Sequence, residues 1–136
     1  MRVNFKIIWV FTLLGISVLQ SCGDKEEVLV EQVPINFNIA EPIEGAMYGQ
    51  GDTVYIEGML TWQNEMHGYE LIIRNETADS VVHTAHSHED SELIYIRKIW
   101  MNNVQEPSGM SLTVDVYTDH EGTKEQQVIY FDCNAR

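Results

Sequence analysis

The chain is 136 residues long and strongly acidic, with 21 acidic and 8 basic residues and a formal net charge of −13. A surface of this charge repels nucleic acid and anionic lipid head groups, which argues against a nucleic-acid partner. It favours cations or basic partners, although high acidity also serves solubility alone. About a hundred residues follow the first thirty, enough for one domain with a core of its own.

The first 22 residues have the three parts of a secretory signal. Arg2 and Lys6 supply positive charge, residues 7–18 form an apolar run, and small or polar residues lead to Cys22. The run is shorter than the ~20 apolar residues of a membrane span and fits the apolar region of a signal peptide. An uncleaved apolar anchor and a soluble secreted protein are the alternatives.

The end of this segment, Leu19-Gln20-Ser21-Cys22, resembles the lipobox of bacterial lipoproteins. The resemblance covers residues 1–22 and implies cleavage before Cys22, acylation of its sulfur and acylation of the new amino group. Two acyl chains hold a protein stably on a bilayer, since each buried methylene contributes ~0.8 kcal/mol. We therefore predict a signal peptide with a signal helix over residues 1–21, and a lipidated Cys22 that anchors the protein to the outer membrane.

The polar and charged segment over residues 22–32 predicts a flexible acidic tether. Within it, Lys25-Glu26-Glu27 resembles the export signal of surface-displayed lipoproteins in some Gram-negative bacteria, and a plain solvated linker is the alternative. The protein is therefore expected to face either the periplasm or the outside. After cleavage the chain carries 6 basic and 21 acidic residues, because Arg2 and Lys6 precede Cys22, and its formal charge becomes −15.

From residue 33 onward, apolar and polar side chains alternate and the pattern breaks repeatedly, which is typical of short strands. The expected strands cover residues 35–39, 53–60, 69–74, 80–85, 92–102, 112–117 and 126–133. Residues 62–68 and 86–91 are expected to be irregular, and Gly58 is expected to mark a bulge or a close backbone contact. The stretch 92–102 fits a helical turn or a strand, and its β-branched and aromatic residues favour a strand.

Seven short strands over about a hundred residues predict an all-β fold, an antiparallel sandwich. Two features resemble bacterial immunoglobulin-like and fibronectin type III-like modules: the strand start Gly51-Asp52-Thr53-Val54, and a last hairpin that turns at Asp119-His120-Glu121-Gly122. The resemblance implies an immunoglobulin-like sandwich over residues 33–136. It implies no specific function, because this architecture hosts many.

Cys133 is left unpaired if Cys22 carries lipid. It alternates with apolar residues along its expected strand, so we predict a buried thiol rather than a reactive or intermolecularly paired one. Trp62 and Trp100 are expected in the core rather than on a binding platform.

Three histidines lie close together in the sequence, His83, His86 and His88. Imidazole binds Zn, Cu and Ni, and carboxylates complete such shells. Residues two apart face the same way on an extended chain, so His86 and His88 are placed to chelate one ion, joined by His83 if the chain bends. These three are the predicted metal ligands, and a solvated His-x-His loop is the alternative. His67 and His120 fall in separate turns, and only the fold determines whether they converge.

No catalytic signature is present: the sequence has no nucleophile elbow, no zincin motif and no phosphate-binding loop. The leading prediction is a non-enzymatic binding or accessory module of the bacterial cell envelope, contacting an envelope protein or a glycan through loops at one end. The alternative is a lipoprotein that binds Zn, Cu or Ni through the three histidines. An enzyme is the third possibility.

Overall fold

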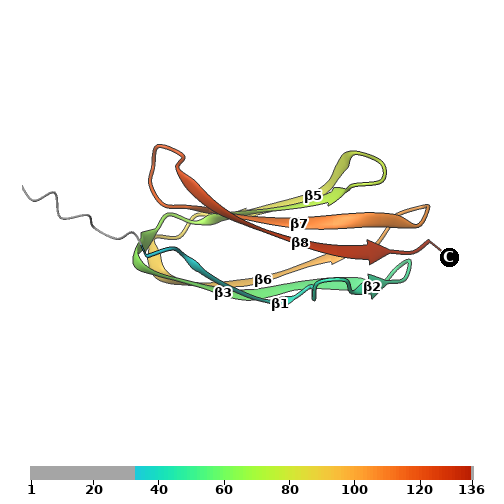
Figure 1. Cartoon of the computed structure of the whole chain (residues 1–136), viewed down its shortest axis with the longest axis horizontal. Coiled ribbons are helices and arrows are strands. Elements are labelled where there is room, and N and C mark those ends of the chain that lie inside the picture. Colours follow the sequence, from blue (N-terminus) through green and yellow to red (C-terminus); the bar gives the residue numbers. More distant parts are fainter. Residues whose placement is uncertain (1–32, 136) are drawn as a thin grey trace, which may run out of the picture. The chain divides into compact units, whose positions relative to one another are not determined.

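The computed structural model describes residues 33–135 (Figure 1), so the predicted signal helix, the tether and Cys22 lie outside the described residues. Eight strands are present: β1 (Asn36–Glu41), β2 (Met47–Tyr48), β3 (Thr53–Met66), β4 (Tyr69–Asn75), β5 (Ser80–Ser87), β6 (Ser91–Met101), β7 (Ser108–Tyr117) and β8 (Lys124–Cys133). Within residues 33–135, no helix has the length and apolar character needed to cross a membrane.

The strands form two sheets that face each other (Figure 1). One sheet has the order β1-β3-β6, and the other has the order β2-β8-β7-β4-β5. Neighbouring strands run antiparallel, except that β2 pairs with β8 in parallel. This division of strands between two antiparallel layers is that of immunoglobulin-like sandwiches. The predicted all-β, immunoglobulin-like sandwich is confirmed, with the two-residue β2 added to the seven expected strands.

Side chains from the inner faces of both sheets form the core. Fully buried residues on facing strands include Val54, Ile56, Leu60, Leu71, Ile73, Ile94, Leu112, Val114 and Val116. Trp100 is buried, and Trp62 packs partly buried against the core while its indole N–H donates to the carbonyl of Val33 at 2.7 Å. Both tryptophans therefore contribute to the core, as expected, rather than to a binding platform.

Two expected irregular segments are partly strand. β3 continues through polar, exposed residues 63–65 to Met66, and β5 continues to Ser87 because Ser87 pairs with Tyr69 of β4. The prediction of irregular structure was therefore wrong for residues 62–66, 86–87 and 91, because β6 begins at Ser91. The ambiguous stretch 92–102 is strand β6 up to Met101, as its composition favoured.

Gly58 lies where β1 and β3 approach each other closely. A Cβ atom at this position would stand 2.8 Å from Cδ1 of Ile39 and 3.0 Å from the carbonyl oxygen of Asn38. The register of β1 shifts just beyond, between Ile39 and Glu41. The predicted close backbone contact is confirmed, and it explains why a residue without a side chain occupies the middle of a strand.

Cys133 is a free thiol and is fully buried. Burial raises its pKa to about 11, with smaller contributions from the charges of Asp132 and Asp52. A thiol with such a pKa holds little of the reactive thiolate at neutral pH. The prediction of a buried cysteine is therefore confirmed, and Cys133 acts as a small apolar side chain.

Candidate functional site

The three predicted metal ligands do not share one surface. His83 pairs with Ile73 across β4 and β5, whereas His86 pairs with Glu70. Successive residues of a strand face opposite sides, so His83 lies partly buried on the core-facing side and His86 is exposed on the outer side. His88 follows β5 in the turn before β6. The structure therefore separates His83 from His86 and leaves only His88 beside other histidines.

Three turns lie at one end of the sandwich, which we call the histidine end (Figure 1). One side chain from each turn reaches a common place there. His67 lies between β3 and β4, Asp90 between β5 and β6, and His120 between β7 and β8. One potential ligand atom from each lies within 4.8 Å of the other two. Nδ1 of His67 is 2.7 Å from Oδ1 of Asp90, and the ring centroids of His67 and His120 are 4.0 Å apart.

Strand register explains the convergence. Met66 and Ser91 are cross-strand partners on β3 and β6, so the next residues outward, His67 and Asp90, meet at the ends of these strands. The backbone N–H of His67 also donates to the carbonyl of Tyr117 at 2.8 Å, at the start of the turn between β7 and β8. All three turns are thus tied to neighbouring strands, and sequence spacing alone does not reveal this arrangement.

Gly68 lets the turn between β3 and β4 lie against the end of β5. Its φ is +112°, and a Cβ atom would stand only 2.2 Å from the carbonyl oxygen of Ser87. The carbonyl of Gly68 accepts the backbone N–H of Tyr117 at 3.0 Å. Glycine is required here both for the backbone conformation and for the space.

The turn that carries His120 is fixed by its neighbour. Oδ1 of Asp119 accepts the backbone N–H groups of Glu121 and Thr123, both at 2.9 Å. Hydrogen bonds from Thr123, side chain first and backbone second, lower the pKa of Asp119. An ionised Asp119 therefore holds the turn closed near neutral pH and presents His120 at its tip.

Asp90 is held in the charged form that metal ions prefer. The hydrogen bond with His67 lowers the pKa of the Asp90 carboxyl, and His67, His88 and His120 lower it further through their charges. The side chain of His67 is 17 % exposed and that of Asp90 is 46 % exposed. The pair of His67 and Asp90 therefore has a largely buried imidazole on one side and a carboxylate that is open to solvent on the other.

A small hollow of about 240 Å³ adjoins two of the three residues, His67 and His120. It is lined by His67, His88, Tyr117, Asp119, His120 and Gly122. The ring centroids of His88 and His120 are 6.4 Å apart. Two imidazoles and a carboxylate offer the nitrogen and oxygen donors that Zn, Ni and Cu(II) accept.

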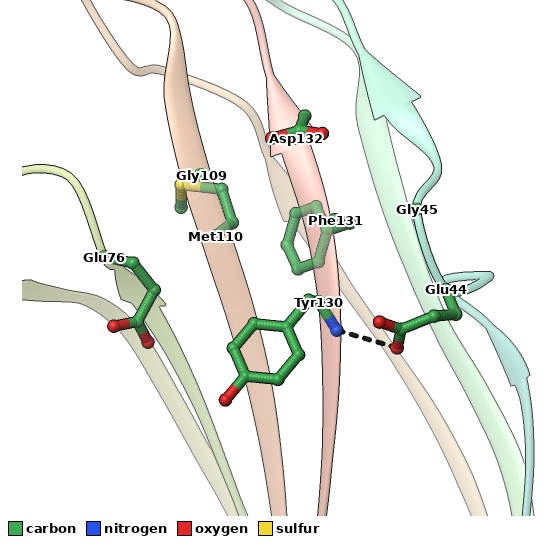
Figure 2. A pocket seen from close by; sticks show the side chains of 8 residues that line it. All are labelled: Glu44, Gly45, Glu76, Gly109, Met110, Tyr130, Phe131 and Asp132. Atoms are coloured by element: carbon green, nitrogen blue, oxygen red, sulfur yellow. Dashed lines mark hydrogen bonds between the residues drawn. The ribbon is translucent and has the colours of Figure 1, made fainter.

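A larger hollow lies at the opposite end of the sandwich, and we call it the acidic pocket (Figure 2). It measures about 400 Å³ and is lined by Glu44, Gly45, Glu76, Gly109, Met110, Tyr130, Phe131 and Asp132. Oε2 of Glu44 accepts the backbone N–H of Tyr130 at 3.0 Å, and the Glu76 carboxylate accepts the hydroxyl of Ser111. Three carboxylates and the exposed Tyr130 ring thus line this hollow, and both kinds of group attract a cation.

No protein-family model and no curated protein matches the sequence. Among solved structures, the chain is similar to the CARDB domain of a protein from Pyrococcus furiosus, which was crystallised in complex with di-metal ions. The two chains are 12% identical, the match covers 75% of this chain and 92% of that one, and the TM-score is 0.45. Similarity at this level supports no inference about the function or the site of this chain.

Proposed function

We propose that the protein is a non-enzymatic, lipid-anchored binding module of the bacterial cell envelope, which presents its acidic pocket to a basic partner. The observation that carries the proposal is where the chain enters the sandwich. Asn36 at the start of β1 pairs with Thr61, and the carbonyl of Val33 accepts a hydrogen bond from the indole of Trp62. The described chain therefore begins at the histidine end (Figure 1). The acidic pocket lies at the other end.

Anchoring at Cys22 would tether the sandwich to the membrane through the chain that enters at the histidine end. Cys22 precedes Val33 by 11 residues, and a segment of this length spans at most about 40 Å. β7 and β8, with 10 residues each, are about 33 Å long. The acidic pocket lies at the end of the sandwich away from Val33, which supports its access to a partner in the periplasm or the outside.

The partner we propose is a Lys- or Arg-rich segment of another envelope protein. The formal charge of −15 on the chain that follows the signal peptide attracts cations over a distance. In the pocket, Glu44, Glu76 and Asp132 supply carboxylates for charge-assisted hydrogen bonds, and Tyr130 supplies an exposed ring for a cation. A glycan partner would use the same hollow without this dependence on charge.

The anchor is tested by labelling the full chain in a Gram-negative host with an alkyne analogue of palmitate. Wild-type protein is expected to carry the label and to fractionate with the outer membrane, whereas Cys22→Ala should lose both. Cys133→Ala is the matched control and should keep both, since Cys133 is buried in the sandwich. A label that persists in Cys22→Ala, or that is absent from the wild type, would contradict the anchor.

The partner class is tested by titrating the protein with a hexalysine peptide. Replacing Glu44, Glu76 and Asp132 by their amides is expected to weaken binding about tenfold, or ~1.4 kcal/mol, and binding should also weaken as salt is raised. The matched control, Glu65→Gln with Glu92→Gln and Glu121→Gln, removes the same charge from exposed positions elsewhere. Equal losses in both triple variants would show that net charge alone attracts the peptide, and the pocket proposal would fail.

A further inference from the structure

We propose that His67, Asp90 and His120 bind one divalent transition-metal ion of the Zn, Ni or Cu(II) class. Of the three, the sequence offered only Asp90, as a carboxylate that could add to a site at His86 and His88, and it left open whether His67 and His120 converge. The site lies at the end opposite the acidic pocket. The inference depends neither on the lipid anchor nor on the basic partner.

The distances suit such an ion. Metal–ligand bonds of ~2.0–2.2 Å place tetrahedral ligand atoms roughly 3.4 Å apart. The three ligand atoms here lie within 4.8 Å of one another, and the pair formed by His67 and Asp90 is at 2.7 Å. Side-chain rotations that move these atoms by about an ångström therefore complete the coordination. The cation would take the place of the proton between Nδ1 of His67 and Oδ1 of Asp90, and that proton would move to Nε2 of His67 or to solvent.

The site is largely formed in advance. Backbone hydrogen bonds to Tyr117 hold the turn that carries His67 and Gly68, and Asp119 closes the turn that carries His120. The imidazole of His67 is mostly buried and loses little freedom when it binds. Ligands that are already in place bind an ion more tightly, because less conformational entropy is lost in ordering the turns when the ion binds.

The fourth coordination position opens into the hollow of about 240 Å³ beside His88 and Tyr117. Structural zinc sites are closed by four protein ligands, whereas three protein ligands leave a place for water or for an incoming donor. The nine core-facing residues named above already form an apolar core away from this end. We therefore assign the ion a role in capture and transfer, and not in holding the fold together.

The test is isothermal titration of the metal-free full chain, in detergent, with zinc chloride. Wild-type protein is expected to bind one equivalent of Zn²⁺ with micromolar or tighter affinity. His67→Ala with His120→Ala should abolish this binding. The matched control, His83→Ala with His86→Ala, also removes two imidazoles and should bind as the wild type does.

Two single variants guard against unfolding of the double variant, because Asp90 and His120 are exposed. His120→Ala and Asp90→Asn should keep the wild-type thermal midpoint and lower zinc affinity by at least about tenfold. The proposal is overturned if the wild type takes up no zinc, if either single variant binds as the wild type does, or if only the His83 and His86 variant loses binding. Loss of zinc binding with retained hexalysine binding would separate this site from the acidic pocket.

Discussion

Gly68→Ala is expected to lower the free energy of unfolding by about 2–4 kcal/mol, because alanine is strained at a φ of +112° and its Cβ would meet a backbone carbonyl at 2.2 Å. The carbonyl belongs to Ser87 in a paired strand, so it cannot move without disturbing the β4–β5 ladder. The urea dependence of the unfolding equilibrium measures the loss.

Gly122 provides the control for this substitution. Its φ is +96°, but no atom lies within 4 Å of a Cβ built there. Gly122→Ala should therefore show only the backbone part of the effect, about 1–2 kcal/mol. If the two variants lose the same stability, the close approach of Gly68 to Ser87 contributes nothing, and the contact is not what selects glycine.

Lys124→Met is expected to destabilise the protein by about 2 kcal/mol, because it leaves the carboxylate of Asp115 without its cation. Asp115 is 1% exposed and is bonded to the ammonium of Lys124 and, at 2.7 Å, to the amide of Gln126. The Lys124 side chain is 42% exposed, and solvent therefore screens the ion pair. The expected loss of stability is for this reason smaller than for a fully buried ion pair. Thermal and urea unfolding should both show this loss of stability, while Arg97→Met, which removes a positive charge from an exposed position, should change little.

The same ion pair gives a pH dependence of defined sign. The hydrogen bond to Asp115 raises the pKa of Lys124, with burial opposing it and the charge of Asp115 adding to it. A raised folded-state pKa stabilises the protein fully below the ordinary lysine value of ~10.4, and the contribution disappears as the pH rises through the higher value. The stability difference between the wild type and Lys124→Met should therefore shrink above that pH. A stability difference that grows instead of shrinking as the pH rises above the ordinary lysine value would contradict the role of the pair.

Side-chain alternation was sufficient to predict the faces that form the core. In β7, Leu112, Val114 and Val116 are all fully buried, as their two-residue spacing indicated. The same rule failed beyond Thr61, where β3 carries exposed polar residues to Met66. That extension follows from pairing of Met66 with Ser91 after a break in register, which local composition does not encode.

The histidine end could not be predicted from spacing for a related reason. His86 and His88 are near each other in the sequence. The residues whose ligand atoms lie close enough to share one ion are instead His67, Asp90 and His120, which come from three turns. Their proximity depends on which strands are neighbours and on the exact residues that pair. A polar residue next to each strand end is the only local signal, and many turns have one.

The parallel pairing of β2 with β8 has a mechanical consequence. β2 follows β1 near the start of the described chain, and β8 ends it at the opposite end of the sandwich (Figure 1). A pull between a membrane anchor and a partner would thus run along the strands and load this pair in shear. Its backbone bonds, from Gly45 to Tyr130, Asp132 to Ala46 and Asn134 to Tyr48, each at 2.8 Å, would have to rupture together instead of unzipping one by one. Such an arrangement would resist extension of the sandwich along its strands more than bonds that break one at a time.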